Sequence, residues 1–202
     1  MRRSSDGLLD TNLNVHFATN RIGDREVFTR TFEGGITAPT LRVRTGDTLR
    51  IRLSNFLPPD VEEEHDDINI PHGFNTTNLH THGFHVSPNC SADGSVCSDN
   101  VLIEVHPGET QQYEYYLPEN HPDGTFWYHP HKHGSAAVQF MGGMAGALIV
   151  EGESDAFLRE HGIERDEVFV LQQIRVKEDG EVRVERFEDF LEHPIFTLNG
   201  QL

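Results

Sequence analysis

A repeated alternation of apolar and charged side chains over short segments is the feature that most constrains the fold. Residues 40–44 (Thr-Leu-Arg-Val-Arg) and residues 48–53 (Thr-Leu-Arg-Ile-Arg-Leu) both alternate, and a Thr-Gly-Asp turn at residues 45–47 separates them. Such an alternation places the apolar side chains on one face of an extended chain. The two segments therefore predict a strand, a turn and a second strand with one buried face.

Further segments with strand character follow, and helical periodicity is almost absent before Gly152. These segments are residues 27–32, 101–105, 112–117, 125–128 and 145–151, together with a histidine-containing stretch that ends at Val86. Short strands separated by turn signals at regular intervals are typical of an all-β sandwich or barrel. The sequence predicts such a domain over residues 25–152, preceded by a polar N-terminal extension at residues 1–24.

The remainder of the chain, residues 153–202, has a different pattern. Residues 154–165 favour a linker helix, whereas residues 167–175, 181–185 and 195–198 have strand character. Two or three strands are marginal as an independent unit. We therefore expect a linker and the incomplete start of a second domain, or an extension packed on the first domain.

Two His-x-His pairs are the strongest functional signal. His80 and His82 form one pair, His129 and His131 form the other, and a glycine follows each pair closely. Residues two apart in an extended chain point to the same side and lie about 6.5–7 Å apart. Imidazole suits zinc, copper, iron and nickel. The two pairs therefore predict a metal site, although the chain has 13 histidines and most of the others are expected on the surface.

The charge of the chain narrows the range of partners. The 33 acidic residues outnumber the 16 basic residues, which gives a formal net charge of -17. This excess argues against nucleic acid and anionic membrane surfaces as partners. The acidic run at residues 62–67 is expected to be solvated, with a carboxylate-rich metal site as the alternative. No apolar stretch approaches membrane-spanning length, and no signal peptide is visible.

The two cysteines lie close together in a loop rich in Ser, Asp and Gly. Cys90 and Cys97 do not have Cys-x-x-Cys spacing, so chelation of a metal by this pair is not expected. A local disulfide would indicate an oxidising compartment. Two free thiols are the alternative, and the sequence leaves both open.

Residues 79–83 (Leu-His-Thr-His-Gly) and 127–131 (Trp-Tyr-His-Pro-His) resemble the two histidine motifs of the first cupredoxin domain of multicopper oxidases, a laccase-like family. Further segments are similar to the family in kind and order, namely residues 41–47, 107–109, 146–152 and 196–200. The resemblance covers most of the chain. It implies an all-β, cupredoxin-like (plastocyanin-like) Greek-key β-sandwich, followed by a linker helix and the first strands of a second such domain.

The resemblance also implies a set of copper ligands. His80 would bind the type 2 copper, His82 and His129 would bind one type 3 copper, and His131 would bind the other. In the family reaction, one-electron oxidations of a donor substrate are coupled to the reduction of dioxygen to water.

Residues near the two motifs are candidates for roles other than copper binding. Asp99 lies where the family usually keeps an acid that helps to deliver protons to the reducing oxygen. Asp93 is the competing residue for that role, and an ordinary loop aspartate is the plain alternative. By resemblance, His85 and His133 are not ligands.

The second half of the family pattern does not occur in these residues. No His-Cys-His segment with a downstream histidine is found, and Cys90 and Cys97 have no such context. We therefore expect no type 1 copper, half the histidines of a trinuclear site and no oxidase activity from the chain alone. A missing C-terminal cupredoxin domain or another chain would complete the site. The family resemblance favours a periplasmic or extracellular location.

Two other functions fit part of the pattern. His80-x-His82-x-x-His85 is similar to the His-x-His-x-Asp-His run of metallo-β-lactamases, but Phe84 stands at the aspartate position. Three histidines with an open water position would suffice for a zinc-dependent hydrolase. The other alternative is a non-catalytic cupredoxin module that binds copper for storage or delivery.

Overall fold

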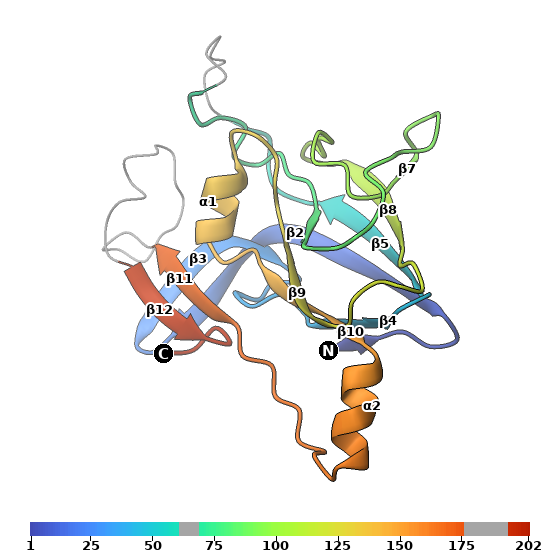
Figure 1. The fold of residues 1–202 in the computed structure, drawn as a ribbon. Helices are drawn as coiled ribbons and strands as arrows, with labels where there is room; N and C mark the ends of the chain where they lie inside the picture. The colour runs from blue at the N-terminus through green and yellow to red at the C-terminus, as the bar shows by residue number, and fades with distance from the viewer. Residues whose placement is uncertain (61–68, 176–193) are drawn as a thin grey trace.

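The computed structural model describes residues 1–60, 69–175 and 194–202 (Figure 1). In chain order the elements are β1 (Arg2–Arg3), β2 (Leu8–Ile22), β3 (Arg25–Phe32), β4 (Leu41–Arg44), β5 (Thr48–Asn55), β6 (His80–His82), β7 (Val96–Cys97), β8 (Thr110–Tyr116), β9 (Gly124–His129), α1 (Ala136–Met141), β10 (Gly146–Glu151), α2 (Glu153–Glu160), β11 (Leu171–Arg175) and β12 (Pro194–Leu198). The acidic run at residues 62–67 and the strand predicted at residues 181–185 lie outside the described residues.

The described strands form two five-stranded sheets and a separate hairpin. One sheet has the order β1-β4-β10-β9-β6, the other has the order β3-β2-β5-β8-β7, and β11 pairs with β12. Apolar side chains from both sheets form a shared core. The predicted all-β sandwich is therefore confirmed.

The first sheet determines where the histidines lie. β10 pairs with β4 in parallel and with β9 in antiparallel orientation, and β9 then pairs with β6. β6 is a short strand at the end of the sheet order, and it contains His80 and His82. The two histidine-bearing segments, which are far apart in the sequence, are thus direct neighbours.

The long strand β2 corrects the expected extension at residues 1–24. β2 pairs with β3 in antiparallel and with β5 in parallel orientation, so it lies inside the second sheet. Leu9, Leu13 and Val15 are buried on its inner face. Thr11 stands at the inner-face position between Leu9 and Leu13 and weakens the alternation, but the neighbouring strands supply hydrogen-bond partners and cover the apolar face. The sandwich therefore begins well before residue 25.

The strand predicted at residues 101–105 is a second correction. Only Val105 pairs, through an isolated bridge with Thr77, and residues 101–104 are outside any strand. Leu102 is 86% exposed, whereas Val105 is buried in the main core and Ile103 packs against it, so the run contributes to the core without joining a sheet. The carbonyl groups of Val101 and Ile103 instead accept hydrogen bonds from the Asn78 side chain.

The main core lies between the two sheets. Leu13, Leu53 and Tyr113 come from the second sheet, and Tyr128 and Leu148 come from the first. Full burial of one such aliphatic side chain is worth about 1.5–3 kcal/mol relative to an exposed position. This core fixes the two sheets face to face and so holds β9 in place.

The position of β9 is fixed further by Tyr128, the residue before His129. Its ring lies against Gly146 of β10, where any added Cβ atom would collide with the tyrosine ring. The Tyr128 hydroxyl donates a hydrogen bond to the carbonyl oxygen of Pro39 at 2.7 Å. A glycine at position 146 is therefore required for the packing beside the histidine segment.

A second, smaller core cluster joins α1 and β11 to the sandwich. Its buried residues are Ile22, Val27, Ile36, Phe74, Val138 and Ile174. Asp166, in the segment before β11, also forms an ion pair with the buried Arg42 at 2.7 Å. The described part of residues 153–202 therefore contacts the sandwich through both apolar and charged groups.

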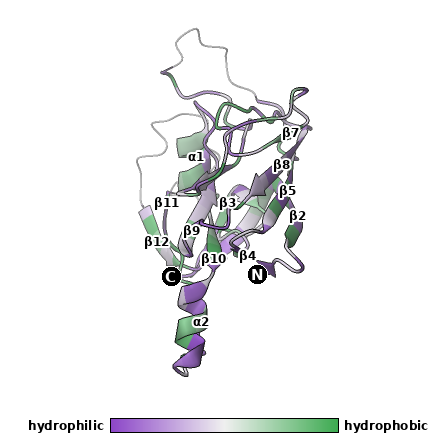
Figure 2. Cartoon of the chain, turned by 45° about the vertical axis from the view of Figure 1, so that its right-hand side comes forward, coloured by the Kyte–Doolittle hydropathy of each residue, from purple (hydrophilic) through white to green (hydrophobic). Residues whose placement is uncertain are grey.

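The linker helix predicted at residues 154–165 is α2, which ends earlier, at Glu160. It has no buried residues, and Figures 1 and 2 show it extending away from the strands, with hydrophilic and hydrophobic residues along its length. Among the described residues, no helix is long and apolar enough to cross a membrane.

Candidate metal site

Pairing of β6 with β9 brings the two His-x-His pairs together. His80 lies directly opposite His129, and His82 lies opposite Trp127. The ring centroid of His80 is 5.2 Å from that of His129 and 5.1 Å from that of His131. All four histidines predicted from the sequence are therefore neighbours in the structure.

Three of these side chains could hold one metal ion. Potential ligand nitrogens of His80, His82 and His129 all lie within 4.8 Å of one another. Nδ1 of His82 and Nε2 of His129 are 3.4 Å apart. His131 lies beside this group, with its ring centroid 6.1 Å from that of His129. A donor set made only of imidazoles fits copper or zinc.

The cluster is open to solvent on one side. His80 and His129 are half-buried, whereas His82 and His131 are exposed. Exposure of two of the four rings leaves room for further ligands from outside the described residues.

Asp99 holds His80 in a defined orientation. Its carboxylate accepts a hydrogen bond from Nδ1 of His80 at 3.0 Å and another from the backbone N–H of Thr81 at 2.8 Å. The Thr81 hydroxyl donates a third hydrogen bond at 3.1 Å. Because the carboxylate accepts the Nδ1 proton, the electron pair of Nε2 remains available to a metal.

Asp93, the alternative acid, forms its hydrogen bonds within its own loop. Its carboxylate accepts hydrogen bonds from the hydroxyl groups of Ser91 and Ser95 at 2.7 Å each. The bond from Ser91 is the largest cause that lowers the pKa of Asp93 to about 2. The structure therefore brings Asp99, rather than Asp93, into contact with a predicted ligand.

His129 is held neutral by its surroundings. Burial is the largest cause that lowers the pKa of His129 to about 4; the neighbouring imidazoles of His80, His131 and His82 act in the same direction, and a hydrogen bond to Pro130 opposes them. Its Nδ1 donates a hydrogen bond to the carbonyl oxygen of Pro130 at 2.8 Å. Metal binding requires a neutral imidazole, so His129 is in the form that can act as a ligand through Nε2.

Asn78 fixes the position of His131, and the sequence did not predict this role. The Asn78 side chain is fully buried, and its Oδ1 accepts a hydrogen bond from the backbone N–H of His131 at 2.6 Å. Its Nδ2 donates to the carbonyl oxygens of Val101 and Ile103. In the sequence, only the place of Asn78 just before the first histidine motif could have indicated this role.

Comparisons with known proteins match the same part of the chain. The family model described as multicopper oxidase matches residues 67–155, which include both histidine pairs and Asp99. The match supports a multicopper oxidase cupredoxin domain over these residues.

The proteins that are similar to this multicopper oxidase domain are much longer chains. Laccase-1 of Thanatephorus cucumeris is 29% identical over 138 residues, which are 68% of this chain and 20% of that protein. An iron transport multicopper oxidase of Kluyveromyces lactis is 33% identical over 123 residues, 61% of this chain and 16% of that protein. The matched part thus spans a fifth or less of these two relatives.

The fold of this multicopper oxidase domain is also found in solved structures. A multicopper oxidase from Campylobacter jejuni, described as a metallo-oxidase, has a TM-score of 0.71 and 24% identity, and covers 98% of this chain and 37% of that one. A multicopper oxidase from Pseudomonas thermotolerans has a TM-score of 0.65 and 24% identity, over 98% of this chain and 42% of that one. The similarity supports the cupredoxin-like fold.

His85 and His133, which follow the two motifs, have partners other than the four clustered histidines. Among the described residues, the group with closely spaced ligand atoms does not include His85. The backbone N–H of His85 instead donates to Nε2 of His121, and the ring of His133 lies 6.2 Å from that of His72. The third histidine expected for a zinc hydrolase is therefore not among the converging side chains.

Cys90 and Cys97 form a disulfide. They are the two cysteines of the chain, so the alternative of two free thiols is wrong. The bond closes the loop that comes directly before Asp99.

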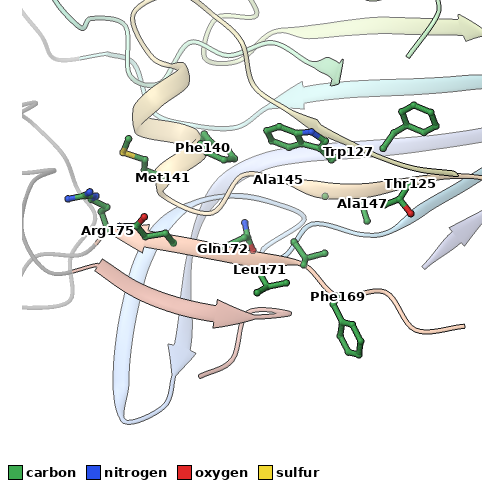
Figure 3. Close-up of a pocket in the computed structure, with 14 residues that line it drawn as sticks. Thr125, Trp127, Phe140, Met141, Ala145, Ala147, Phe169, Leu171, Gln172 and Arg175 are labelled. Carbon is green, nitrogen blue, oxygen red and sulfur yellow. The ribbon is translucent and has the colours of Figure 1, made fainter. Parts of the chain in front are cut away.

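Trp127 also lines a pocket of about 460 Å³ (Figure 3). Its lining is mostly apolar and comes from β9, β10, α1, β11 and the residues just before β11, with Phe126, Trp127, Phe140 and Phe169 as its aromatic members. Trp127 also stacks on the candidate ligands, and the ring centroid of Phe140 is 5.8 Å from that of His129, so the pocket and the cluster share these two side chains.

Proposed function

We propose that His80, His82, His129 and His131 bind copper and provide half of the histidine ligands of a trinuclear site in a multicopper oxidase. His80 would bind the type 2 copper, His82 and His129 one type 3 copper, and His131 the other. The observation that carries this proposal is the convergence of four imidazoles from two paired strand ends. A donor set spread over several ångströms suits neighbouring ions better than a single ion.

Copper at this site would supply electron transfer to dioxygen, which forms water while a donor substrate is oxidised. The protein's own part is to orient the ligands and to handle protons. Asp99 keeps the proton of His80 on Nδ1. Its carboxylate is partly exposed, at 13%, so it can also exchange protons with solvent. We therefore propose Asp99 as the proton relay of the site.

We propose that a second cupredoxin domain or another chain completes the site. A type 1 copper needs a thiolate ligand, and both cysteines of this chain are in the disulfide. The exposure of His82 and His131 is consistent with ligands that come from elsewhere. The 202 residues alone are then expected to bind copper without turning over oxygen. Residues 153–202 fit a linker and the start of the second domain in this proposal.

The proposed location is the periplasm or the extracellular space. The disulfide between Cys90 and Cys97 supports it, because such bonds persist in oxidising compartments.

A non-catalytic copper-binding module is the second candidate function. The absence of a free thiolate in this chain favours it, because the same four histidines could store or deliver copper without any oxidase reaction. The two functions differ in their response to a completing domain. Only the oxidase should consume oxygen when a cupredoxin domain that carries a type 1 site is added.

The experiment is copper loading of the 202-residue chain, followed by mass-spectrometric metal analysis, an electronic spectrum and an oxygen-uptake assay. We expect bound copper, no intense blue thiolate band and no oxygen consumption. Copper should be lost in the double variant His82→Ala/His129→Ala and retained in His106→Asn/His161→Asn, which changes two histidines outside the cluster. Equal copper content in both variants would contradict the site. Retention of zinc in preference to copper would favour a hydrolase.

A further inference from the structure

Trp127 lies flat against two of the candidate ligands. Its ring centroid is 4.7 Å from that of His82, with 24° between the planes, and 4.2 Å from that of His129, with 23° between the planes. The centroids of the two imidazoles are 5.7 Å apart. If the two imidazoles lay on opposite faces of the indole, the distance between their centroids would be close to the sum of their distances from the indole. Both imidazoles therefore lie side by side over the same indole face.

This arrangement follows from the register of the two strands. Trp127 is directly opposite His82 across the β6–β9 pair and precedes His129 by two residues on the same strand. Directly paired residues and residues two apart share one face of a sheet. The indole is held in turn by Phe140 of α1, whose ring centroid is 5.5 Å away.

His82 differs from the other candidate ligands in how it is held. His80 donates to Asp99, His129 donates to Pro130, and the backbone of His131 donates to Asn78. Among the described residues, no carboxylate, carbonyl or amide group is recorded in a hydrogen bond with the His82 ring; its recorded neighbours are His80, His129 and Trp127. Metal-binding histidines are usually oriented by such a hydrogen bond.

We propose that Trp127 is a positioning residue that replaces this hydrogen bond by stacking. The electron pair of an imidazole nitrogen lies in the ring plane, so a surface that fixes two ring planes also fixes where the two electron pairs meet. Here Nδ1 of His82 and Nε2 of His129 approach to 3.4 Å. Trp127 thereby directs both rings toward one type 3 ion. This inference rests on the proposed copper function.

The test uses the full 202-residue chain with Trp127→Leu, Trp127→Phe and the control Phe17→Leu. Phe17 stacks on Phe28 with centroids 5.0 Å apart in the other sheet, so its replacement also removes a stacked aromatic ring. The readouts are copper affinity, from competition with a chelator, and the electron paramagnetic resonance spectrum of bound copper(II). We expect Trp127→Leu to weaken binding about 10-fold or more, the range typical of groups that orient ligands, and to change the spectrum. Trp127→Phe should retain most of the copper affinity and of the wild-type spectrum, and Phe17→Leu should match the wild type in both readouts.

A double-mutant cycle with His82→Ala separates positioning from a general loss of structure. If Trp127 acts largely through His82, then Trp127→Leu should weaken binding much less in the His82→Ala background. Equal weakening in both backgrounds, or wild-type affinity and spectrum in Trp127→Leu, would overturn the inference.

A metal-free measurement keeps this result distinct from the proposed function. In the apo chain, the indole should shift the ring-proton resonances of His82 and His129 upfield, and Trp127→Leu should remove that shift. Unchanged resonances would overturn the inference even if copper binds. Failure of the wild type and of Phe17→Leu to bind copper, with the resonance shift present, would overturn the copper function instead.

Discussion

The Asp99 carboxylate lies 3.0 Å from Nδ1 of His80, and this pair connects the disulfide loop to the metal cluster. Asp99 follows Cys97 by two residues, and its backbone N–H donates to the carbonyl oxygen of Ser87. The loop therefore positions the acid, and the acid positions the ligand. The disulfide loop thus contributes to the geometry of the histidine site.

Asp99→Asn is expected to weaken copper binding about 10- to 100-fold, the effect typical of groups that orient metal-binding histidines. The amide is uncharged, and its NH₂ group cannot accept the hydrogen bonds from Thr81 and His80 that the two carboxylate oxygens accept now. Competition with a chelator measures the affinity. Asp93→Asn is the matched control, since Asp93 bonds within its own loop. An equal loss in both variants would contradict the assigned role.

Asn78→Ala is expected to lower the free energy of unfolding by about 1–3 kcal/mol, the cost of leaving buried polar groups without partners. The change removes the acceptor for the His131 N–H and the donor for the carbonyls of Val101 and Ile103. Urea unfolding followed by circular dichroism measures this free energy of unfolding. Replacement of the exposed Asn89 by alanine should have almost no effect. A stable Asn78→Ala variant that binds copper like the wild type would show that the bond to His131 is unimportant.

Removal of the disulfide by Cys90→Ser/Cys97→Ser is expected to cost about 2–3 kcal/mol of unfolding free energy, from the loop-closure entropy of a short loop. Copper affinity should also fall, because Asp99 follows this loop. Unfolding in urea with and without a reductant gives the measurement. The reductant should destabilise the wild type and leave the double variant unchanged. Insensitivity of the wild type to reduction would argue against a stabilising bond.

The metal-free chain is expected to lose stability as the pH falls below about 6.5, the ordinary pKa of histidine. Burial is the largest cause that lowers the pKa of His121 in the folded chain, so the unfolded chain binds the proton more readily. The contribution of neutral His121 is therefore complete above about pH 6.5 and is lost as the pH falls toward its folded pKa. The neutral ring donates to Pro122 and accepts from the His85 backbone.

His121→Gln tests that contribution, because glutamine keeps an acceptor but does not titrate. Urea unfolding at pH 7.5 and at pH 5.5 should show a smaller loss of stability in the variant than in the wild type. Identical losses would exclude His121 as a source of the pH dependence.

Much of the fold could be predicted from local patterns. The alternation at residues 40–53 and the apolar segment at residues 145–151 correspond to β4, β5 and β10. β2 was missed because polar residues interrupt its buried face, and it is stabilised by strands that follow later in the chain. The apolar run at residues 101–105 has strand composition but bonds to Asn78 instead of a neighbouring strand.

The site could be predicted only in part, for a related reason. The four histidines were identified because each pair is contiguous in sequence and resembles a known motif. The roles of Asn78 and Trp127 depend on which residues face one another across β6, β9 and the loops. This register is set by the pairing of separate segments, so no single segment predicts it. The copper ligands and the proton relay stay predictions until they are measured.

A copper(II) titration followed by tryptophan fluorescence tests the central claim most directly. Trp127 is the only tryptophan of the chain, and it contacts both His82 and His129. We predict saturable quenching in the wild type, the loss of this quenching in His82→Ala/His129→Ala, and displacement of bound zinc by copper, as the usual order of affinities requires. Absence of saturable quenching in the wild type, or the same quenching in the double variant, would contradict a copper site at these histidines.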